Sequence, residues 1–266
     1  MSNVLEAFEQ ALQHRACVLV QVDRTRGSVP RETGAWMAVF GDQTLDTIGG
    51  GRLEMDAIDH ARRLLAGEAV PDVVRYALGP SLGQCCGGEV HLRYTRITQG
   101  QAAHWMDVLQ QAFTPVALFG GGHVGRALVQ VLHTLPMQVT WVDSREAIFP
   151  QEVAPQVHCE HSEPVQSAVA DLAPGSRVLI MSFSHAEDLD IVAACLMRLR
   201  QRDDLPYVGL IGSKTKWASF RQRLSARGFT DAEMARITCP IGVPGIHDKR
   251  PEVIAVAVAA QLLQLG

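Results

Sequence analysis

Two adjacent cysteines lie in a segment that is rich in glycine, Leu78-Gly79-Pro80-Ser81-Leu82-Gly83-Gln84-Cys85-Cys86-Gly87-Gly88. Glycine weakens the interior of a strand or helix and is used where the backbone turns tightly or approaches a ligand closely. Such a loop presents its thiols to a ligand, and thiolates bind soft metals and attack sulfur and other electrophiles. The alternative, two small buried hydrophobic residues, explains the surrounding glycines poorly.

A second segment is typical of dinucleotide binding. Gly120-x-Gly122-x-x-Gly125 follows the apolar run 116–119 and begins a predicted helix, and Asp143 ends the next predicted strand. In this pattern Gly120 permits a turn, Gly122 lets the backbone approach a phosphate, and Gly125 lets the helix pack closely. Asp143 is spaced to contact a ribose hydroxyl. NAD(P) is therefore a candidate cofactor; the alternative is a sheet that uses these glycines for packing alone.

Polar residues also follow two later predicted strands, where open α/β sheets bind their ligands. His185, with Asp188, can transfer a proton or orient a polar ligand, although Ser184 followed by acidic residues is equally typical of a helix N-cap. Ser213 and Lys214 predict either an anion site or a capped surface helix.

Two further candidates lie in loops. His123 lies inside the glycine loop, where it either contacts a ligand or begins a helix facing solvent. Arg31, with Arg24 and Arg26, offers planar guanidinium groups for a phosphate; the alternative is a solvated loop. Of the other cysteines, Cys17 and Cys195 lie on apolar segments and are predicted to be core residues.

The elements that must position these residues fall into two regions. Residues 1–113 predict a smaller α+β domain that carries the cysteine loop between two strands, 73–78 and 89–94. Residues 114–266 alternate apolar strands and helices, which predicts a Rossmann-like parallel sheet with helices on both faces. The fold class is therefore α/β.

Composition excludes several classes of function. The 266 residues are 47% hydrophobic and 20% charged with a net charge of −4, which indicates a globular chain without the basic excess that nucleic-acid binding requires. No apolar stretch is long enough to cross a membrane, and no signal peptide is visible. We therefore expect a cytoplasmic protein whose six cysteines are reduced thiols.

Several of these segments together resemble the xanthine dehydrogenase accessory protein (XdhC) family. The likeness covers nearly the whole chain and rests on segments 27–35, 49–54 and 79–88, the Gly120 loop, Ser184-His185, 207–214 and 239–242. One departure is Phe183, which stands where the family often has a polar residue; His185 is retained.

The resemblance implies a chaperone rather than an enzyme. Such a protein binds molybdenum cofactor (molybdopterin), protects it while a cysteine desulfurase supplies the terminal sulfido ligand, and inserts it into the molybdenum-binding subunit of a xanthine dehydrogenase-type enzyme. It also implies a homodimer. Gln84, Cys85, Cys86 and Gly87 fall on the family's Gln-Cys-Cys-Gly-Gly segment, which implies that the two cysteines contact the metal.

Two other functions remain open from the residues. The Gly120–Gly125 loop with Asp143 is also compatible with an NAD(P)-dependent oxidoreductase, which titration with NADH and NADPH would detect. Cys85 and Cys86 are compatible with a thiol redox sensor, because adjacent cysteines can form a reducible disulfide.

Overall fold

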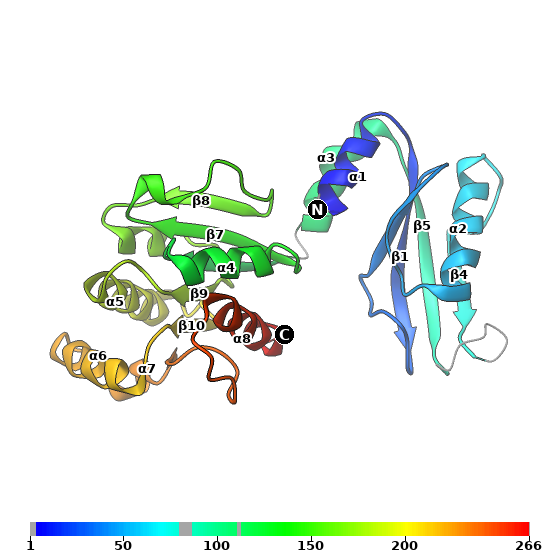
Figure 1. Ribbon diagram of the computed structural model, residues 1–266. Coiled ribbons are helices and arrows are strands. Elements are labelled where there is room, and N and C mark those ends of the chain that lie inside the picture. Colours follow the sequence, from blue (N-terminus) through cyan, green and yellow to red (C-terminus); the bar gives the residue numbers. More distant parts are fainter. Residues whose placement is uncertain (1–3, 80–86, 111–112, 266) are drawn as a thin grey trace. The chain divides into compact units, whose positions relative to one another are not determined.

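The computed structural model describes residues 4–79, 87–110 and 113–265 (Figure 1). The chain divides into two compact units, Met1–Leu109 and Gln110–Gly266, which we call the N-terminal and the C-terminal unit. The division predicted from the sequence, after residue 113, lies a few residues further along the chain. Each unit has its own sheet and its own hydrophobic core.

The N-terminal unit is a five-stranded antiparallel sheet with the strand order β3-β2-β1-β5-β4. Its elements are α1 (Val4–Leu12), β1 (Cys17–Arg26), β2 (Trp36–Val39), β3 (Thr44–Asp46), α2 (Gly51–Leu65), β4 (Val73–Ala77), β5 (Glu89–Ile97), η2 (Gln99–Gln101) and α3 (Ala102–Gln110). The short edge strand β3 is an addition to the elements that the sequence predicts.

The core of this unit follows from two periodicities. Alternate residues of β1 share a face, which places Val18, Val20 and Val22 on one side of the strand, and α2 carries apolar residues four positions apart on one side. The two faces pack together in a core that includes Val18, Val20 and Val22 from the strand and Leu53, Ala57 and Ala61 from the helix. The packing fixes the position of α2, and with it the glycine-rich turn before its first residue.

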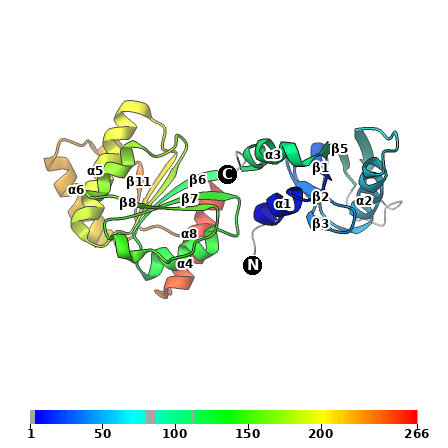
Figure 2. The ribbon, with the colours of Figure 1, turned by 90° about the horizontal axis from the view of Figure 1, so that it is seen from above.

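The C-terminal unit is a six-stranded parallel sheet with the order β11-β10-β9-β6-β7-β8. Its strands are β6 (Thr114–Phe119), β7 (Met137–Asp143), β8 (Val157–His161), β9 (Arg177–Ile180), β10 (Tyr207–Leu210) and β11 (Ile237–Thr238). Its helices are α4 (His123–Leu132), η3 (Glu146–Ile148), η4 (Val165–Ala170), α5 (His185–Arg202), α6 (Lys214–Ala226), α7 (Asp231–Met234) and α8 (Pro251–Gln264). Helices α4 and α8 cover one face and α5 and α6 the other, which confirms the predicted Rossmann-like sheet (Figure 2).

The strand order places a switch point beside β6. From β6 the chain continues through β7 and β8 on one side and then returns to β9 on the other side. In open α/β sheets, ligands bind beside such a point, outside the carboxyl ends of the strands. The Gly120 loop and the segment that begins at Ser182 follow β6 and β9.

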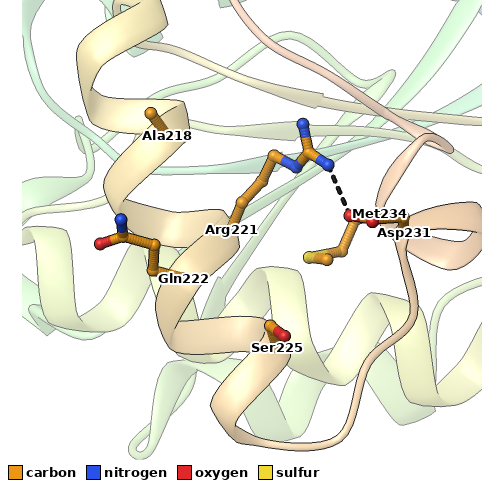
Figure 3. A pocket seen from close by; sticks show the side chains of 6 residues that line it. All are labelled: Ala218, Arg221, Gln222, Ser225, Asp231 and Met234. Carbon is orange, nitrogen blue, oxygen red and sulfur yellow. Dashed lines mark hydrogen bonds and ion pairs between the residues drawn. The ribbon is translucent and has the colours of Figure 1, made fainter.

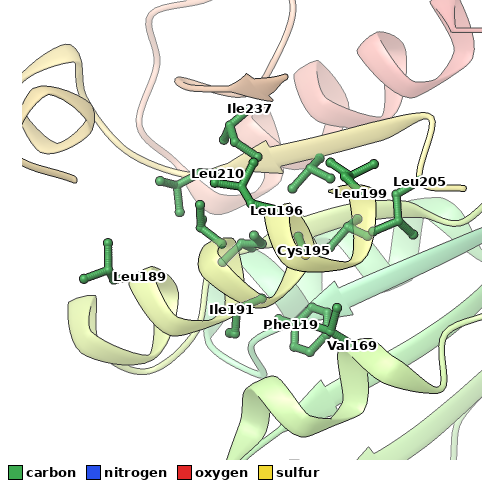
Figure 4. Close-up of a cluster of buried hydrophobic side chains, with 14 of the residues drawn as sticks. Phe119, Val169, Leu189, Ile191, Cys195, Leu196, Leu199, Leu205, Leu210 and Ile237 are labelled. Carbon is green, nitrogen blue, oxygen red and sulfur yellow. The ribbon is translucent and has the colours of Figure 1, made fainter. Parts of the chain in front are cut away.

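Two cysteines belong to the cores, as predicted. Cys195 of α5 is fully buried in an apolar cluster with residues such as Phe119, Leu196 and Leu210 (Figure 4). Cys17 of β1 is also fully buried. Burial raises the pKa of each thiol to about 12, so both are uncharged and unreactive at neutral pH.

Within the described parts of the chain, no helix combines the length and the apolar character that crossing a membrane requires.

Candidate functional site

The glycine loop after β6 is built by two close backbone contacts. A Cβ on Gly120, whose φ is +122°, would lie 2.0 Å from the carbonyl oxygen of Met181, and a Cβ on Gly125 would lie 2.0 Å from that of Gly120. Either side chain would push the loop off the sheet. Gly122 differs, because a Cβ there would meet no described atom within 4 Å. The glycines thus serve packing at two positions and leave open space at the third.

Asp143, at the end of β7, holds this loop in place. Its Oδ2 accepts a hydrogen bond of 2.6 Å from the backbone N–H of Gly121 and one of 2.9 Å from Arg145 Nη2. Its Oδ1 accepts from the backbone N–H and the Nε of Arg145, each at 2.9 Å. The Asp143 side chain is 1% exposed. Asp143, the residue predicted to meet a ribose, connects two loops of the protein.

These contacts also set the charge of the pair. Burial alone would raise the pKa of Asp143, but the hydrogen bonds from Arg145 and Gly121 outweigh it and hold the pKa below its ordinary value. The same ion pair raises the pKa of Arg145. Asp143 is therefore an ionised carboxylate, and it can hold Arg145 and the glycine loop together at neutral pH.

A buried ion pair joins the loops after β9 and β10. Asp188 accepts from Ser182 through Oδ1, at 2.8 Å from its N–H and 2.7 Å from its hydroxyl, and from Lys216 Nζ through Oδ2 at 2.6 Å. Lys216 also donates to the carbonyl of Ile211 at 2.8 Å. The two charged side chains are 3% and 12% exposed. The pair therefore fixes the spacing of two loops at the ligand-binding edge of the sheet.

The two N-cap interpretations agree with the hydrogen bonds at the starts of these helices. Ser184 caps α5 by accepting from the N–H of Glu187 at 3.2 Å, and Ser213 caps α6 by accepting from that of Lys216 at 3.1 Å. His185 is exposed, and its ring meets Phe220 edge-on with centroids 6.4 Å apart. The carboxylate of Asp188 thus binds Ser182 and Lys216, and the structure gives it no hydrogen bond to His185 for a proton relay.

Two further predicted residues, His123 at the first position of α4 and Lys214 at the first position of α6, are exposed. Their side chains face solvent at the edge where the carboxyl ends of the strands lie.

In the N-terminal unit, the cysteine segment connects β4 to β5. The two strands form an antiparallel pair that ends at Ala77 opposite Glu89, and Leu78 N–H donates to the carbonyl of Gly88 at 2.8 Å. Gln84, Cys85 and Cys86 lie outside the described residues. Gly87, which follows them, is exposed. The hairpin therefore fixes both ends of the cysteine segment at one end of the sheet.

The three glycine-containing motifs of the N-terminal unit meet at the base of this hairpin. A Cβ on Gly88 would lie 2.3 Å from the carbonyl oxygen of Ser28 and 2.8 Å from that of Arg26. A Cβ on Gly49 would lie 2.5 Å from the Cβ of Pro30. Segments that are far apart in the sequence therefore touch closely, Gly88 against the backbone of residues 26–28 and Gly49 against the Pro30 ring, and a side chain at either glycine would clash.

The turn before α2 is held by Glu54. Its Oε2 accepts from the N–H of Ile48 at 3.0 Å and of Gly50 at 3.1 Å, and from the hydroxyl of Thr47. A single carboxylate in the first helical turn therefore shapes the 49–51 motif beside Pro30. This network explains why an acidic residue follows three glycines at that spacing.

The predicted arginines lie near this base. Arg26 ends β1 next to the motif contacts, and Arg31 lies in the following loop; both are exposed. Arg24 contacts Asp23 through Nε at 3.4 Å. The guanidinium groups of Arg26 and Arg31 are thus available to an anion at this end of the sheet.

A further site among the described residues could be a cluster of metal ligands or a surface hollow. Among the described residues, no group of three or more His, Cys, Asp and Glu side chains is arranged to hold a metal ion. A surface hollow of about 480 Å³ between α6 and α7 is lined by residues such as Arg221, Ser225 and Asp231 and contains none of the predicted site residues (Figure 3).

Sequence reasoning missed three features of the two sites. Arg145 follows Asp143 by two positions, but nothing in the pattern indicates that it turns back to the carboxylate. The Asp188–Lys216 pair joins residues 28 positions apart, and the signal that could have found it is a lysine in the first turn of one helix and an aspartate in that of its neighbour. The convergence of the N-terminal glycines was also absent from the prediction, although all three motifs were identified.

Fold and site together define a class of protein: a Rossmann-type unit preceded by an antiparallel unit whose hairpin carries two adjacent cysteines. Residues 116–262 match the XdhC Rossmann domain, and residues 11–77 match the XdhC and CoxI family. The chain belongs to the XdhC family.

Individual relatives are more distant. YqeB of Escherichia coli strain K12, an uncharacterized protein, is 26% identical over 272 residues, which include 100% of this chain and 46% of YqeB. The chain thus spans about half the length of this curated relative. A crystal structure from Bacillus halodurans, described as a xanthine dehydrogenase, shares the fold with a TM-score of 0.77 at 20% identity, over 100% of this chain and 96% of that chain.

Proposed function

We propose that this protein is an accessory factor that binds molybdenum cofactor, holds it while its terminal sulfur is added, and inserts it into a xanthine dehydrogenase-type enzyme. Membership of the XdhC family supports the broader role, an association with the maturation of xanthine dehydrogenase. The observation that carries the finer proposal is the convergence of the three N-terminal glycine motifs at the base of the cysteine hairpin.

This base offers the groups that such a cargo requires. Molybdenum in the cofactor is thiophilic, which suits Cys85 and Cys86, and the pterin and phosphate need polar contacts. Exposed Arg26 and Arg31 lie at the same end of the sheet and can pair with the phosphate as planar donors.

Release is as important as binding for a protein that delivers its cargo. Two thiolate contacts on one loop hold a metal less firmly than a closed cage of four ligands, so the cargo can be passed on. Close packing at Gly88 and Gly49, rather than a set of metal ligands, holds the described part of this site. We propose a cysteine desulfurase and the apo-enzyme as transient partners, and a homodimer as the working form.

The test is purification from a host that makes the cofactor, under anaerobic conditions, followed by analysis of molybdenum and pterin. The wild type is expected to carry both and to restore activity to an apo-enzyme of the xanthine dehydrogenase type. The double variant Cys85→Ala/Cys86→Ala is expected to lose both.

The matched control is Cys159→Ala, which removes a half-buried thiol of the C-terminal unit. It should carry as much molybdenum as the wild type. Absence of pterin from the wild-type protein, or equal pterin in the double variant, would refute the proposal. A reducible disulfide between the adjacent cysteines, without bound pterin, would favour the redox-sensor alternative.

A further inference from the structure

The C-terminal unit has the glycine loop of a dinucleotide site, and the residue that would read the ribose is Asp143. In such sites an acidic residue at the end of the second strand accepts hydrogen bonds from the ribose hydroxyls of NAD. A carboxylate has about four lone-pair positions. All four contacts to Asp143 come from the protein: the N–H of Gly121 and three N–H groups of Arg145. The residues present therefore do not fit the diol of an unphosphorylated ribose.

Arg145 occupies the exposed side of the same position. Its side chain is 35% exposed, whereas that of Asp143 is 1% exposed. Side-chain contacts to Asp143 use two of the five N–H groups of its guanidinium, Nε and Nη2. The remaining three can donate to another group. A ligand at this edge of the sheet thus meets a cation where the NAD pattern places an anion.

The guanidinium of Arg145 lies over an aromatic ring. Arg145 Cζ is 4.5 Å from the ring centroid of Phe183, the residue that departs from the family pattern. Phe183 is 67% exposed, although it is a large apolar residue. The ring stabilises the cation, and a guanidinium is the group that paired recognition of phosphate oxygens uses.

Several other charged residues lie near Arg145, and Glu146, its neighbour in the sequence, is exposed. Glu187 raises the pKa of Arg145, but its Oε2 is shielded from solvent and its Oε1 accepts from Ser144 at 2.7 Å. Arg126 donates to the carbonyls of Gly121 at 3.3 Å and Ile148 at 2.8 Å. His161 contacts the carbonyl of Ser144 at 3.1 Å.

Asp143 and the Oε2 of Glu187 are therefore shielded from solvent, whereas the side chain of Arg145 is 35% exposed.

We infer that the C-terminal unit selects a ribose that carries a 2′-phosphate over an unphosphorylated one, with Arg145 as the residue that reads the phosphate. Asp143 is then a positioning residue, which holds Arg145 and the glycine loop rather than the ligand. This inference concerns a second site and does not rest on the proposed handling of molybdenum cofactor by the N-terminal unit.

The experiment is an equilibrium titration of the full chain with NADPH and with NADH, followed by the change in nucleotide fluorescence. The wild type is expected to bind NADPH at least about tenfold more tightly, as one charge-assisted contact would give. Competition by 2′-AMP is expected at lower concentration than competition by 5′-AMP or inorganic phosphate. These competition experiments distinguish recognition of a phosphorylated ribose from binding of a simple anion.

Two variants test the role of Arg145 without leaving a buried charge unpaired. Asp143→Asn/Arg145→Gln removes both charges together, so that no buried carboxylate is left unpaired, and is expected to abolish the preference for NADPH. Phe183→Ala, at an exposed position, is expected to reduce the preference by a factor of about two to five, since the ring's support of the cation is worth about 0.5–1 kcal/mol at an exposed site.

Several results would overturn the inference. They are NADH binding as tightly as NADPH, no binding of either nucleotide at millimolar concentration, or a full NADPH preference in the double variant. Equal competition by 2′-AMP and inorganic phosphate would also refute the role of the ribose.

Discussion

The two candidate sites hold their loops in place by different interactions. In the C-terminal unit, side chains hold the loops: Asp143 binds Gly121 and Arg145, and Asp188 binds Lys216. In the N-terminal unit, close backbone packing holds the loops, with Gly88 against Ser28. The side-chain site depends on charge, whereas the backbone site depends on the absence of a side chain. We therefore expect loss of charge to disrupt the C-terminal site and addition of a side chain at glycine to disrupt the N-terminal site.

The largest effect is expected from Lys216→Met. This change removes the cation from a pair in which Asp188 is 3% exposed, and an uncompensated buried charge costs about 3–5 kcal/mol. Chemical denaturation should show this loss as a lower midpoint. The double variant Asp188→Asn/Lys216→Met should be more stable than the single one. A single variant as stable as the wild type would show that side-chain charge does not hold this edge of the sheet.

Gly125→Ala tests the contact between the glycine loop and α4. The new Cβ would lie 2.0 Å from the carbonyl oxygen of Gly120, and such overpacking costs about 2–3 kcal/mol. Gly122→Ala is the matched control, since no described atom lies within 4 Å of its Cβ, and it should change stability by less than about 0.5 kcal/mol. Hydrogen exchange of the C-terminal unit measures both. Equal effects would contradict the packing role.

Gly88→Ala tests the N-terminal site in the same way. A Cβ 2.3 Å from the carbonyl oxygen of Ser28 must move the hairpin, at a cost of about 1–3 kcal/mol. The hairpin carries the cysteines, so molybdenum retention should also fall at least about tenfold. Gly41→Ala, outside the three motifs of the N-terminal unit, places a Cβ that meets no described atom within 4 Å and should retain the metal. A loss of the same size in both variants would contradict the claim that packing at Gly88 positions the cysteine hairpin.

The smallest effect is on pH dependence. The pKa of Asp143 is lower in the folded protein than its ordinary value, so its contribution is present above about pH 4 and is lost as the pH falls through the folded pKa. Asp143→Asn should therefore be less stable than the wild type at pH 7, and the difference should shrink at pH 3. Denaturation at both pH values checks this. A constant difference would show that ionisation of Asp143 does not hold the loop.

Local patterns in the sequence predicted much of this molecule. The segments that became β1, β6 and β7 are rich in β-branched and apolar residues, and Gly120-x-Gly122-x-x-Gly125 has its context in the neighbouring strand and helix. Because each of these patterns spans few residues, it can be recognised without knowledge of the tertiary fold. The predicted N-caps at Ser184 and Ser213 are local for the same reason.

The parts that could not be predicted depend on contacts between distant residues. Asp143 has the spacing of a ribose-binding acid, but its role is decided by the direction of Arg145, which the pattern does not contain. The meeting of Gly88 with Ser28 depends on the pairing of β1 with β5. Cys85 and Cys86, on which the functional prediction rests, lie outside the described residues, so their role stays a prediction.

The most direct test of the account is anaerobic equilibrium binding of isolated molybdenum cofactor to the wild type and to Cys85→Ala, with bound molybdenum and pterin measured per chain. We predict a complex close to one cofactor per chain for the wild type and for Cys159→Ala, and at least about tenfold weaker retention by Cys85→Ala. Equal retention by all three proteins would contradict the claim that the cysteine hairpin holds the cargo.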